Sequence, residues 1–237
     1  RFGIYKKDVV AQMKKKKNIW IHTVSIGEFL SVLPLISNLQ KENNIVVTLT
    51  TKTGRKVASK HFPNGTHLFF PADFYPVMLK TIRKINPKLI VIVETEIWPN
   101  LLKIASDKNI PIVLINGRIS PSSFPMYKKY KFFISRFLHL FSTITMRNLF
   151  EADRILAIGA PKDKIQIVGS MKFDLAYTMS KNIQPQQIRE KYNIPPNKKV
   201  IVFGSIHPAE ETSIVEISEK ILHNFKDTII IIVPRYL

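Results

Sequence analysis

The sequence predicts a doubly wound α/β fold, in which a parallel sheet carries helices on both faces. Short apolar runs alternate with amphipathic segments along most of the 237 residues, and this repeated strand–helix order is typical of parallel βαβ units. The apolar runs are also continuous rather than alternating, as in "LIVIVE" at residues 89–94. A continuous run indicates a strand buried on both faces, as in the sheet of an α/β domain.

The expected strands and helices alternate along the chain. Strands are expected at residues 19–24, 45–50, 67–70, 89–94, 112–115, 143–146 and 166–168. Helices are expected at residues 28–41, 54–61, 75–85, 100–108, 126–141 and 148–157. Together these elements would make residues 1–179 one complete Rossmann-like domain.

A change in composition predicts a second unit. Residues 180–199, "SKNIQPQQIREKYNIPPNKK", are polar and contain prolines, which is typical of an interdomain linker. Residues 200–237 then predict a strand at 200–203, a turn "GSIHPAEE", a helix ending at Phe225 and a strand at 228–233. We expect this single βαβ unit to be the truncated start of a second Rossmann-like domain, and the chain to be a fragment.

The chain is strongly basic and contains no cysteine. Lys and Arg number 36 against 17 Asp and Glu, which gives a formal net charge of +19. This excess favours an anionic partner such as nucleic acid, acidic lipid or a phosphorylated substrate, and a Lys-rich proteome is the alternative explanation. The lack of cysteine excludes disulfides and thiolate metal sites. No apolar run is long enough to predict a membrane span, and we expect no signal peptide within this sequence.

Polar motifs follow five of the expected strands. They are "SIGE" at residues 25–28, "TTKTG" at 50–54, "ETEIWPN" at 94–100, "NGRIS" at 116–120 and "GSMKFD" at 169–174. The carboxyl ends of parallel strands meet at one edge of a sheet, where ligands bind. The sequence therefore predicts that Glu28, Glu94, Arg118 and Lys172 converge on one rim.

Glu28 is the candidate general base of this rim. Gly27 leaves room for a ligand to approach the backbone, and the dipole at the start of the following helix favours an ionised Glu28. An ionised carboxylate at a strand end suits proton removal. The alternative is that Glu28 only caps its helix. The polar residues at the other four strand ends favour the catalytic role.

Glu94 and Glu96 form a second acidic feature. Two residues apart on a strand, they would face the same side, and such neighbouring carboxylates hold a metal or a perturbed proton. The six His are scattered and no Asp-x-Asp pattern is present, so we expect no metal. Pro99 in "WPN" is placed to open a helix, which is an equally good structural explanation of that motif.

The motifs "IHTVSIGE", "VETEIWPN", "NGRIS" and "GSMKFD", in this order, resemble those of 3-deoxy-D-manno-octulosonic acid (Kdo) transferases. The resemblance runs from "RFG" at Arg1 to "PR" at Pro234 and Arg235. It implies a GT-B architecture of two Rossmann-like domains with the site in the cleft between them. It also implies inverting transfer of Kdo from CMP-Kdo to the lipid A precursor, lipid IVA, in lipopolysaccharide synthesis, without a cofactor.

Residue roles also follow from the resemblance. Glu28 corresponds to the catalytic base, and Glu94 and Lys172 correspond to residues that support the transition state. Pro234 and Arg235 match the start of the CMP-binding set. The expected substrate-binding residues are Ser25, Gly27, Thr53, Gly54, Arg118, Ser120, Pro234 and Arg235.

The match to the family has departures. Tyr236 and Gly117 stand where the family usually has His and Ala. The hydrophobic anchor that usually precedes "RFG" and the later Gly-rich CMP-binding segments are absent from the chain. By resemblance the protein is expected at the cytoplasmic face of the inner membrane, and this chain alone is expected to be inactive.

Two other functions remain as alternatives. One is another GT-B nucleotide-sugar enzyme, such as an epimerase. The other is a basic nucleic-acid-binding α/β protein, although no zinc spacing, RNP-like motif or helix-turn-helix supports it. The segment "MYKKYKFFISRFLHLF" at residues 126–141 interleaves Lys with aromatic residues. It fits base stacking, a basic amphipathic helix on an anionic membrane, or a helix packed on the sheet with solvated lysines.

Overall fold

The computed structural model describes residues 2–14, 18–181 and 183–235. The chain divides into two compact units, Arg1–Thr178 and Met179–Leu237. The first unit is built on one seven-stranded parallel sheet, so the predicted α/β class is confirmed. Tyr236, where the sequence departs from the family pattern, lies outside the described residues.

Strand order in the first unit creates a switch point at its centre. The strands are β1 (Asn18–His22), β2 (Asn44–Leu49), β3 (Thr66–Phe69), β4 (Pro87–Val93), β5 (Ile112–Gly117), β6 (Thr143–Met146) and β7 (Ile165–Ile167). Their order across the sheet is β3-β2-β1-β4-β5-β6-β7, with every neighbouring pair parallel. The chain runs outward from β1 to β3 and then returns to β4 on the other side of β1. In such sheets the crevice for a ligand lies where this reversal occurs, here between β1 and β4.

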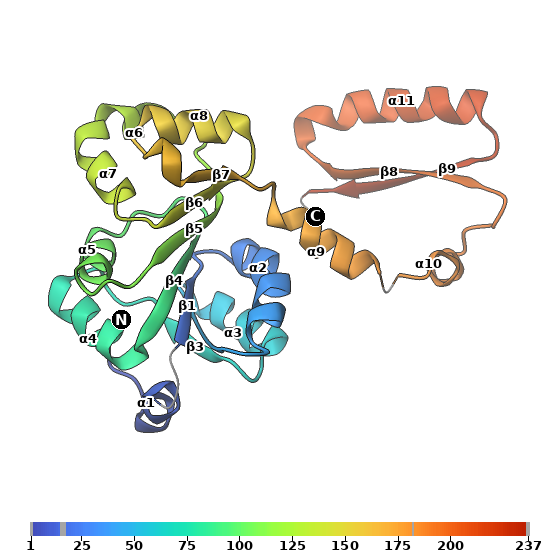
Figure 1. The fold of residues 1–237 in the computed structure, drawn as a ribbon. Helices are drawn as coiled ribbons and strands as arrows, with labels where there is room; N and C mark the ends of the chain where they lie inside the picture. The colour runs from blue at the N-terminus through green and yellow to red at the C-terminus, as the bar shows by residue number, and fades with distance from the viewer. Residues whose placement is uncertain (1, 15–17, 182, 236–237) are drawn as a thin grey trace. The chain divides into compact units, whose positions relative to one another are not determined.

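Helices cover both faces of this sheet, as Figure 1 shows for α2 and α3 on one face and α4 and α5 on the other. Their bounds are α1 (Lys7–Lys14), α2 (Ile26–Leu39), α3 (Lys52–His61), α4 (Tyr75–Ile85), α5 (Pro99–Asp107), α6 (Phe124–Lys129), α7 (Lys131–Leu138), α8 (Leu149–Ala157) and α9 (Met171–Ser180). In the part of the chain that the structure describes, no helix has both the length and the apolar character to cross a bilayer.

The core consists of two apolar clusters, one on each face of the sheet. Ile19 and Ile21 of β1 pack in the cluster that contains Phe29 of α2. Trp20, between them, packs in the other cluster with Ile82 of α4. Because successive strand residues point to opposite faces, each central strand is buried on both sides. This burial explains the continuous apolar runs in the sequence.

Three local features differ from the sequence-based expectation. The helix expected at residues 126–141 is two helices, because the backbone turns at Tyr130 (φ −98°, ψ 22°) between α6 and α7. This turn allows Phe124 and Tyr127 to pack on the same cluster as Ile134. Helices α1 and α9 were not expected. The predicted linker contains α10 (Pro185–Lys191), which starts with proline at a position that favours it.

The second unit contains a two-stranded parallel sheet. Its strands are β8 (Lys199–Ile206) and β9 (Thr228–Pro234), and α11 (Glu211–Asn224) connects them. This is the βαβ unit that the sequence predicts.

Candidate active site at the carboxyl ends of β1, β4 and β5

Glu28 is held over the turn between β1 and α2. Ser25 is the N-cap of α2, and its Oγ accepts the Glu28 N–H at 3.1 Å. The Glu28 carboxylate in turn accepts the Val24 N–H at 2.6 Å. The helix cap is therefore Ser25, and the Glu28 carboxylate is fixed against the turn after β1 at the switch point. The alternative that Glu28 only caps its helix is not what the hydrogen bonds show.

The environment of Glu28 favours proton binding. Burial raises the pKa of the Glu28 carboxyl, hydrogen bonds from Val24 and Ser25 lower it, and the negative charge of Glu94 raises it. The net direction is upward. A carboxylate whose pKa moves from its ordinary acidic range toward neutrality is a better match for a general base.

Glu94 occupies an unusual backbone conformation directly after β4. Its φ is 61°, in the left-handed region that non-glycine residues rarely adopt. Its N–H donates to Ile115 O at 2.9 Å, and its carbonyl accepts the Glu96 N–H at 3.1 Å. The expectation that Glu94 and Glu96 face the same side of an extended strand is wrong, because β4 ends at Val93 and the chain turns at Glu94.

Glu96 joins this acidic cluster. Burial raises its pKa to about 7, and the negative charges of Glu28 and Glu94 act in the same direction. Burial raises the pKa of the Tyr127 hydroxyl on α6, and the negative charge of Glu96 raises it further. Tyr127 is therefore near Glu96. Three carboxylates thus interact at the ends of β1 and β4. In the described residues, no group of three or more His, Cys, Asp or Glu side chains is arranged to hold a metal ion.

The residues after β5 lie against the residues after β4. The Arg118 N–H donates to Thr95 Oγ1 at 3.0 Å, and the Arg118 side chain is exposed. The Ser120 hydroxyl forms hydrogen bonds with Ser122 and Ser123 at 2.9 and 2.7 Å. Arg118 and Ser120 therefore lie on the same rim as Glu94.

Lys172 follows β7, which is four strands away from β1, or about 19 Å. The chain turns back after β7 at Gly169, whose φ of 86° is in the left-handed region. The N–H of Met171 then donates to Asn116 Oδ1 at the end of β5, at 3.4 Å, and Met171 packs on the apolar cluster with Val93. Lys172, exposed in the first turn of α9, is thereby brought back toward the centre of the rim.

The residues after β2 also reach this rim. Thr50 Oγ1 donates to Val24 O at 2.8 Å, which joins the two turns. Thr53 is exposed in the first turn of α3. Gly54 is buried, and a Cβ added there would lie 3.2 Å from the Leu49 side chain. Its lack of a side chain therefore serves the packing of α3, whereas a Cβ at Gly27 would meet open space apart from Ser25 Oγ at 3.9 Å.

Pro234 and Arg235 belong to the second unit. Pro234 ends β9, and the Arg235 N–H donates to Ile206 O at 3.0 Å. Both residues are exposed.

His22, the histidine of "IHTVSIGE", has a structural environment. It is fully buried, its ring stacks on Phe70 with centroids 3.8 Å apart, and its Nδ1 lies 3.0 Å from Thr48 Oγ1. Burial lowers its pKa to about 3. His22 is therefore neutral at physiological pH and supports the end of β1.

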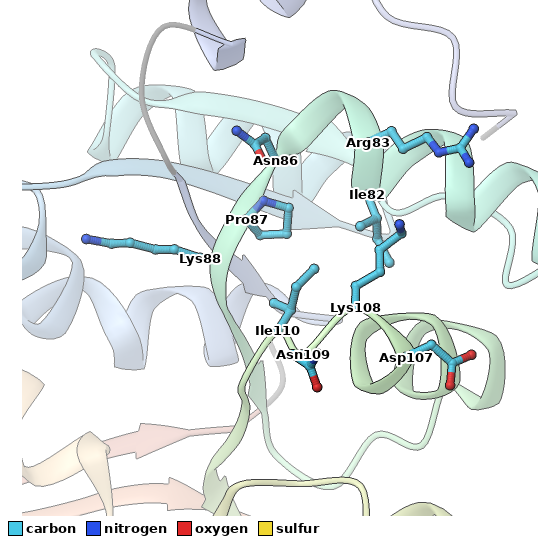
Figure 2. Close-up of a pocket in the computed structure, with 9 residues that line it drawn as sticks. All are labelled: Ile82, Arg83, Asn86, Pro87, Lys88, Asp107, Lys108, Asn109 and Ile110. Atoms are coloured by element: carbon cyan, nitrogen blue, oxygen red, sulfur yellow. The ribbon is translucent and has the colours of Figure 1, made fainter.

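A separate hollow of about 710 Å³ lies at the opposite end of the sheet. It lies beside the start of β4 and the carboxyl ends of α4 and α5. Figure 2 shows that the side chains of Arg83 and Lys88 point in different directions rather than toward a common point. This hollow does not contain a convergent set of catalytic groups.

Sequence analysis missed three residues that shape the rim, namely Thr95, Asn116 and Glu151. Asn148-x-x-Glu151 has the spacing of a helix cap, and Asn148 Oδ1 does accept the Glu151 N–H at 2.9 Å. That pattern marks a helix start. It carries no signal for the bond that Glu151 makes to Ile119, which is 32 residues away in the sequence.

Comparison with known families decides the relationship. The family model described as 3-deoxy-D-manno-octulosonic-acid transferase (kdotransferase) matches residues 1–175. The chain belongs to this Kdo transferase family. Glu28 and Glu94, from two of the motifs that carried the resemblance, lie at the central switch point of this sheet.

Curated relatives extend this relationship beyond the matched residues. The chain is 28% identical to the 3-deoxy-D-manno-octulosonic acid transferase of Haemophilus influenzae, over 100% of this chain and 55% of the relative. It is 30% identical to the Rickettsia typhi enzyme of the same name, over 92% of the chain and 47% of the relative. A bifunctional glycosyltransferase/methyltransferase of Fusobacterium nucleatum is 33% identical over 96% of the chain and 36% of its own length. The chain spans about half the length of these Kdo transferase relatives.

Solved structures support the fold of this Kdo transferase family member. A UDP-GlcNAc 2-epimerase from Neisseria meningitidis aligns with a TM-score of 0.64 at 15% identity, over 91% of this chain and 64% of that one. A Listeria monocytogenes protein described as a UDP-N-acetylglucosamine 2-epimerase aligns with a TM-score of 0.66 at 12% identity, over 92% of this chain and 62% of that one. These matches confirm the GT-B fold class and, at such low identity, concern the fold alone.

Proposed function

We propose that this chain supplies the acceptor side of an inverting Kdo transferase that moves Kdo from CMP-Kdo to the lipid A precursor, lipid IVA. The observation that carries the proposal is the pairing of β1 with β4, which brings Glu28 and Glu94 together at the switch point in a chain of the Kdo transferase family. Ligands bind α/β sheets at this position.

Glu28 is the general base in this proposal. A sugar hydroxyl is a weak nucleophile until its proton is removed, and the Glu28 carboxylate takes that proton as the hydroxyl oxygen bonds to the anomeric carbon of Kdo. The bond from that carbon to the CMP phosphate breaks in the same step, and CMP carries away the electron pair. Attack opposite the leaving group inverts the anomeric centre. The raised pKa of Glu28 suits it to hold the proton as the bond forms.

Cationic groups stabilise the leaving phosphate. Lys172 on α9 is exposed and positively charged, and such a group stabilises the charge that develops on a phosphate. Arg235, after β9 of the second unit, is a further exposed cation, which the resemblance assigns to CMP binding. Glu94 supports the transition state from the neighbouring strand. The other rim residues, Ser25, Gly27, Thr53, Arg118 and Ser120, contact the two substrates, with Gly54 supporting Thr53 and Pro234 positioning Arg235.

An anionic membrane surface is the proposed location, at the cytoplasmic face of the inner membrane. The exposed residues of α6 and α7 combine cations with aromatic rings: Lys128, Lys129, Tyr130, Lys131, Phe132, Phe133 and Arg136. Phe132 is 77% exposed, and the Arg136 guanidinium lies 4.3 Å from its ring. Exposed aromatic residues among cations suit the headgroup region of anionic lipid, where the acceptor lipid resides. The same face would suit a nucleic-acid strand, which is the alternative function.

Direct assay of Kdo transfer tests the proposal. Because the relatives are about twice as long, the chain is joined to the remaining carboxyl-terminal residues of the Haemophilus influenzae relative and assayed with CMP-Kdo and lipid IVA. The chain alone and that carboxyl-terminal half alone serve as controls. We expect transfer only by the joined protein. Comparable turnover by the chain alone would show that the donor site is misplaced, and no transfer by the joined protein would contradict the proposed function.

A further inference from the structure

Glu151 is a buried acid at the rim that the reaction scheme does not use. It lies in the first turn of α8, and its side chain is 9% exposed. Removing a carboxylate from water is unfavourable unless strong partners compensate. An apolar residue at this position would pack on the sheet without that cost. The hydrogen-bond and ion-pair partners of Glu151 therefore indicate the role of its negative charge.

Side chains of α8 bind both polar backbone groups of one residue after β5, Ile119. Glu151 Oε2 accepts the Ile119 N–H at 2.7 Å, and Arg154 Nη1 donates to the Ile119 carbonyl at 2.8 Å. Both polar backbone groups of Ile119 are thus bound by side chains from α8. Arg147 Nη2 holds the other carboxylate oxygen at 3.2 Å, and Arg154 lies 3.6 Å from the first. Hydrogen bonds of this kind, with one charged member, are stronger than neutral ones.

The acidic turn after β4 makes a second hydrogen bond to the same backbone segment, residues 118–119. The N–H of Arg118, the residue before Ile119, donates to Thr95 Oγ1 at 3.0 Å. Thr95 is itself flanked by Glu94 and Glu96. Two successive backbone N–H groups are therefore held from two elements, the acidic turn and α8. Movement of residues 118–119 would move Thr95 and the two glutamates beside it.

The acidic turn needs such support. Glu94 has a left-handed backbone (φ 61°), and such a conformation persists only when its surroundings hold it. We propose that Glu151 is a positioning residue, which acts with Arg154 and Thr95 to fix residues 118–119 and, through Thr95, the turn that carries Glu94 and Glu96. This inference rests on the proposed Kdo transfer for its catalytic readout. The hydrogen-exchange test of this positioning role does not depend on Kdo transfer.

Four variants separate positioning from general stability. Thr95→Val keeps the shape of the side chain but removes the oxygen that accepts the Arg118 N–H, and Thr95→Ser restores it. Glu151→Gln cannot accept hydrogen bonds with both terminal atoms, so it loses either the Ile119 or the Arg147 bond. Ile155→Ala is the matched control, because Ile155 lies on the same helix, is fully buried and belongs to the apolar cluster.

Hydrogen exchange of the peptide covering residues 94–96 is measured on the 237-residue chain, together with the unfolding midpoint. We expect faster exchange in Thr95→Val and Glu151→Gln, near-wild-type exchange in Thr95→Ser, and a lowered unfolding midpoint without faster exchange in Ile155→Ala. Unchanged exchange in Thr95→Val and Glu151→Gln would overturn the proposal.

Turnover and its pH profile are measured on the joined protein. Because small displacements of catalytic groups cost up to about a hundredfold in rate, we expect Thr95→Val and Glu151→Gln to lower kcat by about ten- to a hundredfold and to shift the pH profile. Thr95→Ser should recover most of that loss. A loss of kcat no larger than that of Ile155→Ala, with an unshifted profile, would make Glu151 merely structural. Absence of Kdo transfer by the wild-type joined protein would instead contradict the proposed function, and exchange would still decide the positioning role.

Discussion

Glu28 lies in the first turn of the helix after β1, and Glu94 directly follows β4, the strand that pairs with β1. Burial and, to a lesser degree, the negative charge of Glu94 raise the pKa of Glu28. This relationship depends on topology. The two residues are separated by more than sixty positions, and they meet only because the chain returns to the centre of the sheet after β3. The proton affinity of Glu28 depends mainly on burial and to a lesser degree on Glu94, so it should respond to a change in either residue.

Glu28→Gln should abolish transfer while keeping the fold. The amide can still accept the Val24 N–H, so the turn after β1 should persist, but it cannot take a proton from the acceptor hydroxyl. Loss of a general base costs roughly a hundred- to ten-thousand-fold in rate. The measurement is kcat of the joined protein with CMP-Kdo and lipid IVA, with the circular dichroism spectrum as the control for folding. Near-wild-type turnover would remove Glu28 from its assigned role.

Glu96 should make the stability of the chain depend on pH. Its folded-state pKa of about 7 lies above the ordinary value of 4.5, so the folded state holds the proton more tightly than the unfolded state. Its contribution to the free energy of unfolding is complete below pH 4.5 and is lost as the pH rises through 7. The loss is on the order of 1–3 kcal/mol after allowance for solvent screening.

Glu96→Gln isolates this effect from the other titrating groups. Urea unfolding of wild type and Glu96→Gln at pH 5 and pH 8 gives the difference in unfolding free energy at each pH. We expect the variant to gain stability relative to wild type between pH 5 and pH 8, because its side chain carries no charge to bury. A difference that does not change with pH would contradict the raised pKa.

Much of the fold follows from the sequence, because burial on both faces leaves a continuous apolar run at each central strand. The seven strands of the first unit and the two of the second lie where these runs predict them. Their order across the sheet does not follow from the runs, since a run does not show which strands pair with each other. The turn at Tyr130 was missed because the apolar spacing of residues 126–141 is compatible with one continuous helix.

The candidate site is less accessible to sequence analysis than the fold. The strand-end motifs indicate Glu28 and Glu94, because polar residues that follow apolar runs are visible in the sequence. The left-handed backbone of Glu94 is not visible, since glutamate has no preference for it. The contact of Glu151 with Ile119 is also hidden, because it joins distant segments and a lone acid in an amphipathic helix is normally exposed.

Gly117→Ala should destabilise the first unit. A Cβ added at Gly117 would meet Met146 Sδ and would lie 2.8 Å from the carbonyl oxygen of Thr145. A backbone oxygen in a paired strand cannot move aside easily, so β5 and β6 would have to separate. We expect a loss of about 1–3 kcal/mol in the free energy of unfolding.

Urea unfolding of the 237-residue chain measures this loss. Gly27→Ala is the matched control, because a Cβ there meets little besides Ser25 Oγ at 3.9 Å and alanine favours the helix by up to about 1 kcal/mol. A Gly117→Ala protein as stable as Gly27→Ala would show that β6 relaxes without cost.

Three lysines of α6 and α7, Lys128, Lys129 and Lys131, should contribute to binding of anionic membranes. All three are exposed, and each basic residue near such a surface contributes on the order of 1 kcal/mol. Replacing all three by Glu should therefore lower the affinity for anionic vesicles, measured by sedimentation, by roughly a hundredfold or more. High salt should weaken wild-type binding because it screens exposed charges. The control replaces Lys52, Lys56 and Lys60 of α3 by Glu, which changes the net charge equally at exposed positions on a different helix.

The two triple variants distinguish a specific surface from net charge. If the overall charge of +19 caused binding, both variants would lose the same affinity, since each removes six units of positive charge. If the face of α6 and α7 binds, its variant loses far more than the α3 variant, because Phe132 and Phe133 lie beside the replaced lysines and insert into the headgroup region only when that face approaches the membrane. Random oligonucleotides at physiological salt provide the comparison with the alternative function. Stronger binding to oligonucleotides than to vesicles, with the same dependence on these lysines, would assign the surface to nucleic acid instead.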